Sequence, residues 1–381
     1  MVPYRPTRVL VQTESWQDSM TAEILGRLPA VPVSTIDRPE AAIAELSSSS
    51  DSHATGKRTL ILARNPGQFM KSCPGSGAEI CCNYYVINFA LNCHFDCTYC
   101  ILQSYLDNPA LVVFTNCEAL MDEVIAQVSA QPGRFFRIGT GELADSLALD
   151  DLTHYSLRLV PHFAGLRNAV LELKTKSDRI ANLRGLEHKG HTVVSWSVNS
   201  MAICRAEELK AAPLEERLAA ARQCQNWGYR IGFHFDPLVC YEGWEEDYHS
   251  AVEEIFREID PAGVAWVSLG ALRFTPHLRE LVRRRFPKSK VPYGEFVPGH
   301  HSKLRYFRPI REEMYSKMTA WIRELAPQVF VYLCMEDRAA WRHGLDWTPR
   351  DSQDLSDRMD SLVSISDFGL RIADCGLRNT D

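Results

Sequence analysis

Three cysteines carry the pattern with the clearest chemistry. Cys93, Cys97 and Cys100 follow one another with the spacing C-x3-C-x2-C. Thiolates this close along the chain can bind three irons of a cubane cluster, which normally takes four thiolates, so one iron stays open to a small molecule. A zinc site would need a fourth ligand at structural spacing, and no CxxC or HxxxH pattern follows. The spacing predicts a 4Fe–4S cluster, with a zinc site or three unrelated core cysteines as the alternatives.

This cysteine loop resembles that of the radical S-adenosylmethionine (SAM) enzymes, in which SAM binds the open iron. Tyr99, directly before the last cysteine, fits the aromatic position of that family. The resemblance implies that the reduced cluster cleaves SAM to a 5′-deoxyadenosyl radical. It makes Tyr99 a candidate catalytic residue and SAM a second cofactor. We expect an electron donor such as flavodoxin or ferredoxin as a partner.

Composition limits the class of protein. The chain has 381 residues, 45% of them hydrophobic and 24% charged, and a formal net charge of −6. Any affinity for nucleic acid must therefore come from a local basic patch. No apolar run approaches the ~18 residues of a membrane span, and residues 1–6 do not resemble a signal peptide. Twelve cysteines in such a chain indicate metal ligation in a reducing, cytoplasmic setting and no membrane partner.

Strand and helix patterns alternate after the cysteine loop. The expected strands are 84–89, 135–138, 169–173, 192–197, 231–235 and 265–269. The expected helices are 118–129, 151–162, 177–188, 214–225, 248–259 and 276–285. Connections of this length suit parallel crossovers. The six units predict an α/β fold with a partial (β/α)6 TIM-like barrel.

The sequence divides into three expected regions. Residues 1–75 read as a small N-terminal α/β domain with strands near 8–12, 31–34 and 58–63 and a helix near 18–28. Residues 76–330 form the partial barrel and include a hairpin near 292–308. Residues 331–381 supply a C-terminal strand and a polar, acidic tail that we expect to be peripheral.

Polar residues follow the second and third expected barrel strands, at the end where such folds place their sites. Gly141 and Glu142 form a Gly–Glu pair of the kind that radical SAM enzymes often use to receive the SAM ammonium. Lys174 is placed to pair with the SAM carboxylate as a point charge. The alternatives are an ordinary glycine turn and a solvated helix entry.

The fourth and fifth strands also end in polar residues. Alternation places Ser195, Ser197 and Asn199 on one face, where the ribose and carboxylate of SAM are natural hydrogen-bond partners. His234 ends the fifth strand and is a further cofactor-binding candidate. A helix cap at Ser200 and a core histidine are the competing interpretations.

Cations and aromatic residues later in the chain suggest contact with nucleic acid. Arg273 follows the sixth strand and is a candidate anion contact. The stretch 300–308 contains Lys303, Arg305 and Tyr306, and such a mixture suits phosphate contact combined with base stacking. An exposed hairpin with no nucleic-acid partner would carry the same residues.

From about Val9 to Leu333 the chain resembles the spore photoproduct lyases, which are radical SAM enzymes of DNA repair. The motifs that carry the likeness are the cluster loop, Arg58–Leu60, Cys100–Gln103, Ser197–Ser200, Glu242–Glu246, Leu272–Thr275 and Lys303-x-Arg305-Tyr306. The resemblance implies reversal of a methylene-bridged thymine dimer with SAM re-formed. It also implies that Arg305 and Tyr306 wedge into DNA while the dimer is flipped out.

Two departures from the lyase pattern bear on the mechanism. The lyases carry a hydrogen-donor cysteine after the second strand, and residues 139–145 contain none. They also carry a tyrosine directly after the last cluster cysteine, where this chain has Ile101. The substitute donors by sequence are Cys82, Cys117, Cys240 and Cys334, and the roles of Cys73, Cys81 and Cys82 stay open.

Two other functions compete with repair of a thymine dimer. One is a radical SAM reaction on a different nucleotide, peptide or metabolite. The other is a nucleic-acid-binding or redox-sensing protein whose cluster is structural, with a fourth ligand from Cys73, Cys81 or Cys82.

Overall fold

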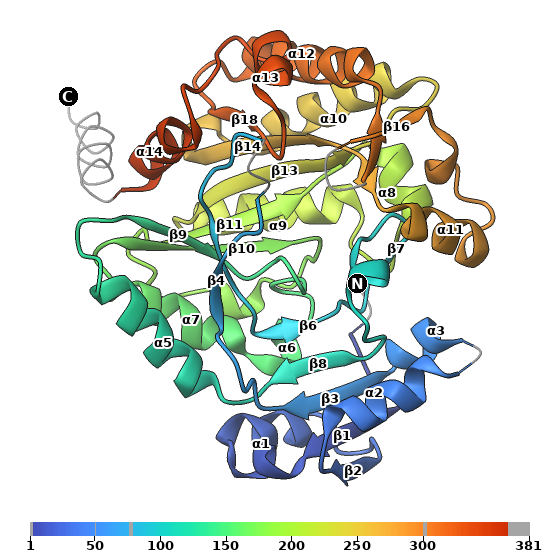
Figure 1. Cartoon of the computed structure of the whole chain (residues 1–381). Coiled ribbons are helices and arrows are strands. Elements are labelled where there is room, and N and C mark those ends of the chain that lie inside the picture. Colours follow the sequence, from blue (N-terminus) through green and yellow to red (C-terminus); the bar gives the residue numbers. More distant parts are fainter. Residues whose placement is uncertain (1–2, 50, 76–78, 300–302, 365–381) are drawn as a thin grey trace.

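The computed structural model describes residues 3–49, 51–75, 79–299 and 303–364 (Figure 1). Two main sheets organise these residues, one built around the N-terminal segment and one that forms the curved barrel wall. No helix in these ranges is long and apolar enough to cross a bilayer.

The N-terminal sheet has five strands in the order β2-β1-β3-β8-β6. They are β1 (Arg8–Gln12), β2 (Val33–Ile36), β3 (Thr59–Ala63), β6 (Ala90–Leu91) and β8 (Leu111–Phe114). The expected first domain supplies three of them, and the other two come from the chain beyond residue 75. The short apolar run at β8 is fully buried against β3, so the sheet extends past the expected boundary.

The barrel sheet has eight strands in the order β18-β14-β13-β11-β10-β9-β5-β4. They are β4 (Met70–Ser72), β5 (Tyr85–Ile87), β9 (Phe136–Gly139), β10 (Ala169–Thr175), β11 (Thr192–Ser197), β13 (Arg230–Leu238), β14 (Val264–Ala271) and β18 (Val331–Leu333). The six expected strands are neighbours in chain order and pair in parallel. The partial barrel is thus confirmed, with β18 and β4 added at its edges.

Two small sheets complete the strands. One pairs β7 (Asp96–Cys97) with β12 (Glu208–Leu209). The other joins β15 (Arg273–Phe274), β17 (Leu304–Tyr306) and β16 (Phe296–Pro298). The antiparallel pair β16–β17 is the expected hairpin; residues 300–302 lie outside the described residues.

Helices lie along both main sheets, the first three of them beside the N-terminal sheet and most of the later ones along the barrel sheet (Figure 1). They are α1 (Ser19–Gly26), α2 (Pro39–Ser47), α3 (Ser52–Gly56), α4 (Leu102–Tyr105), α5 (Cys117–Ser129), α6 (Asp150–Thr153), α7 (Tyr155–Phe163), α8 (Met201–Glu207), α9 (Leu214–Asn226), α10 (Trp244–Glu258), α11 (Pro276–Arg285), α12 (Arg308–Leu325), α13 (Arg338–Gly344) and α14 (Ser352–Val363).

The helix expected over 177–188 was wrong. This segment holds only the short 3-10 turn Ala181–Leu183. The Thr175 hydroxyl accepts the backbone N–H of Ser177 at 2.9 Å, and the Ser177 hydroxyl accepts that of Arg179 at 3.1 Å. Such side-chain bonds offer the backbone an alternative to a helix.

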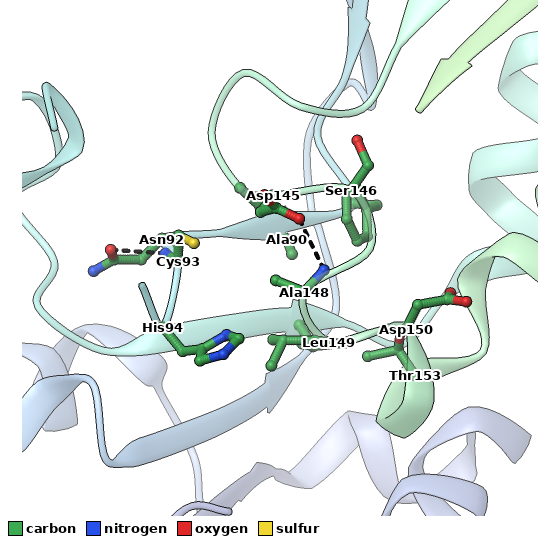
Figure 2. A pocket seen from close by; sticks show the side chains of 13 residues that line it. Ala90, Asn92, Cys93, His94, Asp145, Ser146, Ala148, Leu149, Asp150 and Thr153 are labelled. Atoms are coloured by element: carbon green, nitrogen blue, oxygen red, sulfur yellow. Dashed lines mark hydrogen bonds between the residues drawn. The ribbon is translucent and has the colours of Figure 1, made fainter. Parts of the chain in front are cut away.

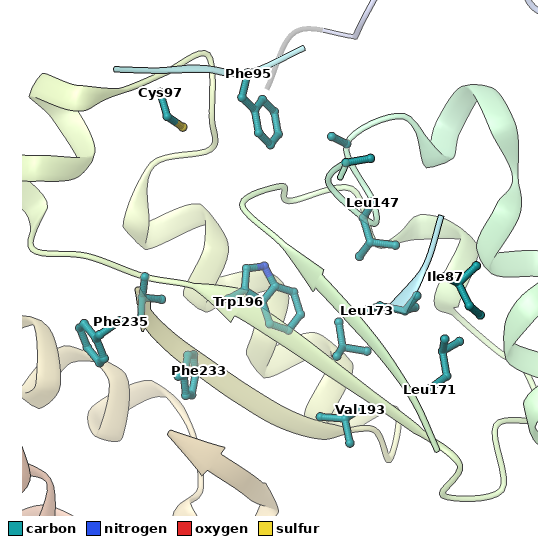
Figure 3. Packing of buried hydrophobic residues seen from close by; sticks show 14 of the residues in the cluster. Ile87, Phe95, Cys97, Leu147, Leu171, Leu173, Val193, Trp196, Phe233 and Phe235 are labelled. Carbon is teal, nitrogen blue, oxygen red and sulfur yellow. The ribbon is translucent and has the colours of Figure 1, made fainter. Parts of the chain in front are cut away.

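The barrel strands bury large apolar side chains against the loops at the barrel mouth. Figure 3 shows Leu173, Trp196 and Phe233 on the strands, with Leu147 and Phe95 from loops on the same side. The indole N–H of Trp196 donates to the Ser177 carbonyl at 2.9 Å, so the ring is buried without an unpaired donor. This packing fixes the strand ends that hold the polar residues.

The acidic segment after residue 347 is not peripheral throughout. Helix α14 buries Leu355 and Met359, and Asp360 Oδ1 lies 2.6 Å from Arg137 Nε on β9. The apolar residues of α14 share one face, which the acidic composition obscured in the sequence. Residues 365–381 of the expected tail lie outside the described residues.

Candidate cluster and cofactor site

The cluster loop begins at a sharp turn after β6. Asn92 has a left-handed backbone with φ 71°, which asparagine tolerates better than most residues. Its side-chain amide donates to the carbonyls of Asn108 and Pro109 at 3.1 Å, and its backbone N–H donates to Leu143 O at 2.7 Å. Cys93 follows at once, so the first cluster cysteine is anchored to the loop after β9.

Two adjacent glutamates hold the middle of the loop. Glu208 pairs with Cys97 in the β7–β12 ladder. The Glu207 carbonyl accepts the Thr98 N–H at 2.8 Å, and the Glu207 carboxylate accepts the Thr98 hydroxyl. The path from Cys97 to Tyr99 is therefore fixed by both backbone and side chains.

Tyr99 lies inside a buried charged group. Its phenol donates to the Glu208 carboxylate. Lys176 Nζ is 2.8 Å from Glu208 Oε1 and 3.2 Å from the Tyr99 hydroxyl, and Arg217 Nη2 is 2.5 Å from Glu208 Oε2. Burial and the Glu208 charge raise the pKa of Tyr99 well above its usual value, so the phenol stays protonated.

The outer side of the loop is held by Asp96. Its carboxylate lies 3.0 Å from Lys57 Nζ, 3.1 Å from Arg285 Nη2 and 3.8 Å from Lys210 Nζ. Arg285 belongs to the basic helix α11. Arg285 at the end of this helix thus braces the cluster loop.

The three thiols fit an iron–sulfur cluster in their chemistry and placement. Burial raises the pKa of Cys97 to about 12, against the opposing charges of Lys176 and Arg217, so a cation is needed to keep its thiolate. No group of three His, Cys, Asp or Glu side chains in the described ranges converges to hold a single metal ion. A cubane places each thiolate on a different iron, so its ligands need no common centre.

A pocket opens beside Cys93. Figure 2 shows Cys93, His94, Asp145 and Ser146 lining it. Asp145 accepts hydrogen bonds from the Thr175 hydroxyl and from backbone N–H groups. Burial raises the pKa of this carboxyl. The pocket thus joins the first cysteine to the loop after β9 and the end of β10.

Gly141, Glu142 and Lys174 come together at the ends of β9 and β10. A Cβ on Gly141 would lie 2.9 Å from the Lys174 Cβ and carbonyl oxygen, so only glycine permits this approach. Burial raises the pKa of Glu142, and the Lys174 charge opposes that rise. Lys174 and Glu142 are half-buried.

Ser195 and His234 meet at a buried carboxylate that sequence reasoning missed. Glu172 Oε1 accepts from Ser195 Oγ at 2.5 Å and from the Trp266 indole at 3.2 Å, and it lies 2.8 Å from His234 Nε2. Burial raises the pKa of Glu172, but the charge and hydrogen bond of His234 outweigh it and leave the pKa at about 2. A glutamate inside the apolar run 169–173 was the available signal.

Only glycine fits at position 139, next to the residues around Glu172. A Cβ at Gly139 would lie 1.4 Å from the Tyr84 hydroxyl, and this buried phenol hydrogen-bonds Glu172. The glycine that ends β9 therefore makes room for the tyrosine that directly precedes β5.

Ser197 and Asn199 are placed differently from one another. Asn199 Nδ2 donates to Pro237 O at 2.8 Å, and its Oδ1 accepts from the Ser200 N–H and the Tyr248 hydroxyl. Its side chain is thus fully used within the protein. Ser197 is half-buried at the strand end, and its carbonyl accepts from Arg217 at 2.9 Å.

The hairpin buries the two residues expected to form a wedge. Arg305 is 6% exposed and pairs with Glu336 at 2.7 Å, and Tyr306 is 2% exposed and accepts the Cys240 N–H at 3.0 Å. An exposed wedge of these side chains is not what the structure contains, because β17 is the central strand of its small sheet. Phe307, which sequence reasoning passed over, is 53% exposed.

Arg273 and Lys303 lie near one another. Arg273 Nη2 is 3.3 Å from Asp236 Oδ2 and 3.9 Å from Cys334 Sγ. Burial lowers the pKa of Lys303, and the charge of Arg273 lowers it further. Lys303 is half-buried.

Four cysteines lie close enough to one another for their charges to interact. Cys73, Cys81, Cys82 and Cys334 act on one another electrostatically. A hydrogen bond from Cys82 lowers the pKa of Cys81 to about 7. Burial raises the pKa of Cys73 to about 12, and the charges of Glu142, Lys174 and Arg273 also act on this thiol. Cys73 is thus within electrostatic range of Glu142 and Lys174.

The partial barrel with a cysteine loop at its mouth defines a protein of the radical SAM fold class. A model of the spore photoproduct lyase family matches residues 5–331, and the chain belongs to that family.

Curated relatives and solved structures agree with this assignment. Spore photoproduct lyase of Bacillus subtilis (strain 168) is 28% identical over 214 residues, and that of Geobacillus sp. (strain Y412MC61) is 27% identical over 215 residues. Each alignment covers 55% of this chain and 63% of the relative, which is less than two thirds of its length.

The solved structures resemble this chain over a larger part of it. A spore photoproduct lyase complexed with dinucleoside spore photoproduct is 20% identical with a TM-score of 0.77. A double mutant with bound AdoMet and the same dinucleoside is 21% identical with a TM-score of 0.79. Each match covers 87% of this chain and 100% of the other, which establishes the fold.

Proposed function

We propose that this chain is a radical SAM lyase that repairs the spore photoproduct, a methylene-bridged thymine dimer in DNA. Cys93, Cys97 and Cys100 would hold the 4Fe–4S cluster. When bound, the cluster and SAM supply a deoxyadenosyl radical that takes a hydrogen atom from the substrate and returns one at the end. The observation that carries the proposal is the braced cysteine loop beside the Gly141–Lys174 group.

Lys174 and Glu142 are our candidates for the methionine part of SAM. In the described ranges the Lys174 ammonium forms no hydrogen bond or ion pair within the protein, so it is available to a carboxylate. The Glu142 carboxyl lies within electrostatic range of Lys174 and is suited to bind the ammonium group of SAM. Ser197 remains a candidate at the next strand end. Ser195, Asn199 and His234 are engaged elsewhere, and we assign them to support of the barrel.

The substrate would enter on the side of Arg273 and Lys303. A phosphate there would compete with Asp236 for Arg273 and would compensate the charge of the half-buried Lys303 ammonium. The exposed Phe307 ring is better placed to stack on a base than Tyr306, which is buried. Two cations and an exposed aromatic ring are side chains of the kind that suit a dinucleotide lesion.

Cys73 is our candidate for the hydrogen donor that residues 139–145 lack. Its raised pKa keeps the thiol as S–H, the form that can give a hydrogen atom. The thiol would donate this atom to the carbon radical of the substrate and recover one in the return step. Tyr99 stays the candidate for the return path, with its phenol held by Glu208.

The test is an anaerobic assay of the protein reconstituted with iron and sulfide. With SAM and dithionite we expect 5′-deoxyadenosine, and with an oligonucleotide carrying the spore photoproduct we expect loss of the lesion. Cys93→Ala should abolish both. Deoxyadenosine without lesion loss would overturn the assigned substrate, and no SAM cleavage would overturn the radical SAM assignment.

A pair of cysteine variants tests the donor. Cys73→Ala should leave SAM cleavage intact and reduce lesion reversal at least tenfold. Cys240→Ala, another half-buried cysteine, should leave both unchanged. Equal effects of the two substitutions would exclude Cys73 as the donor.

A further inference from the structure

A group of charged side chains lies behind the cluster loop. It consists of Tyr99, Lys176, Glu208 and Arg217, is here called the Glu208 group, and contains two cations but only one carboxylate. The Glu208 and Arg217 side chains are fully buried, and that of Lys176 is 15% exposed. Two cations, Lys176 and Arg217, share the single carboxylate of Glu208. The protonated Tyr99 phenol adds no charge. The group therefore has one net positive charge in a site largely closed to water.

This charge lies against the cluster loop. Glu208 pairs with Cys97 in the β7–β12 ladder, and Tyr99 stands between Cys97 and Cys100 in the chain. Lys176 Nζ is 5.5 Å from the centre of the Tyr99 ring. Both Lys176 and Arg217 act electrostatically on the Cys97 sulfur. Any group bound by these cysteines is within reach of the positive charge.

The cations are fixed in place. Arg217 also donates to Ala212 O at 2.7 Å and to Ser197 O at 2.9 Å, and Lys176 bonds both Glu208 and Tyr99. Charges in a dry, rigid site act more strongly than charges in water. A fixed positive charge favours whichever state of a neighbouring centre is more negative.

We propose that the Glu208 group sets the reduction potential of the cluster, with Lys176 and Arg217 favouring the reduced state and Glu208 moderating their effect. The inference rests on the proposed cluster on Cys93, Cys97 and Cys100. Reduction adds one negative charge to a cluster, and the surrounding charge and hydrogen bonds set its potential. These are positioning residues, since they act through the cluster loop.

A purely structural clamp makes a different prediction from electrostatic tuning. If the group only holds the loop, loss of either Lys176 or Glu208 loosens the site in the same way. If it tunes the potential, loss of a cation and loss of the carboxylate shift the potential in opposite directions.

The experiment is a redox titration followed by electron paramagnetic resonance on the reconstituted full chain without SAM. Lys176→Met should lower the midpoint potential, with the ratio of reduced to oxidised cluster falling about tenfold at the wild-type midpoint, or about 59 mV for one electron. Glu208→Gln should raise the midpoint. Lys176→Arg, which keeps the charge, should stay near wild type.

Iron content and a distant control separate the outcomes. Lys317→Met, which removes a cation from α12, should leave the potential unchanged. Shifts of Lys176→Met and Glu208→Gln in the same direction, or no shift in variants with full iron content, would overturn the tuning role. If Glu208→Gln loses iron, the comparison of Lys176→Met with Lys176→Arg decides. Equal midpoint potentials of these two variants would overturn the tuning role. A wild-type chain that binds no cluster would instead overturn the proposed function.

Discussion

Glu172 and Glu208 are both buried carboxylates, but they bind their surroundings differently. Glu172 receives hydrogen bonds from Ser195 and Trp266 and pairs with His234. Those partners lie on β11, β14 and β13, strands that already pair with one another through their backbones. Glu208 instead forms ion pairs with Lys176 and Arg217 and accepts a hydrogen bond from the Tyr99 phenol. These three residues lie on segments that share little backbone pairing.

The difference indicates two purposes for a buried charge. Glu172 cross-links a sheet whose positions are already set, so its removal should mainly cost stability. Glu208 fixes a loop to the barrel mouth, so its removal should mainly change the properties of that loop. The following variants test this contrast.

The largest expected effect is that of Glu172→Ala. It leaves the donors of Ser195, His234 and Trp266 buried without an acceptor, and breaking a buried pair costs about 3–5 kcal/mol. Urea unfolding should show a loss of this size in the free energy of unfolding. Glu253→Ala, at an exposed position, should change it by less than about 0.5 kcal/mol. A loss below about 1 kcal/mol at Glu172 would contradict its role in the sheet.

The next effect appears in acid. The folded-state pKa of Glu172 is about 2, below its ordinary value of 4.5, so the carboxylate contributes stability above the ordinary value and loses it as pH falls towards 2. The whole contribution is about 3 kcal/mol. Glu172→Gln should therefore show a weaker decline of stability between pH 5 and pH 2 than the wild type, measured by urea unfolding at each pH. Parallel curves for the two proteins would contradict the assignment.

The smallest effect is that of Tyr99→Phe. The variant loses one hydrogen bond to a carboxylate that keeps both cations, and we expect a loss of about 1.5 kcal/mol. Iron content after reconstitution should stay at the wild-type level. A loss as large as that of Glu172→Ala would mean that the two carboxylates do not differ in the way proposed.

The barrel strands were predictable because each one is a short apolar run bounded by turn residues. The order β5-β9-β10-β11-β13-β14 follows from their crossovers, and the cysteine spacing is visible in the sequence. The helix over 177–188 was not predictable from apolar spacing, because the hydroxyls of Thr175 and Ser177 take the N–H groups that a helix would use.

Partners distant in sequence were the main gap in the predicted site. Alternation correctly placed Ser195 on an inner face, but nothing near it in sequence indicated Glu172, 23 residues away. The same holds for Tyr99 and Glu208, 109 residues apart. Arg305 and Tyr306 looked like exposed wedge residues because Glu336 and Phe296, which bury them, lie elsewhere in the chain.

The interleaved sheets have a consequence for the order of folding during synthesis. The N-terminal sheet is complete once Phe114 has left the ribosome, because β8 is its last strand. The barrel edge waits for β18, which ends at Leu333, and at 5–20 residues per second that interval lasts about 10–40 s. In the last part of this interval, after β14 ends at Ala271, the edge of β14 that will pair with β18 has no neighbour for about 3–12 s. An open parallel edge invites pairing between nascent chains. A ribosome-bound chain that stops before Val331 is therefore the form of this protein that most needs a chaperone.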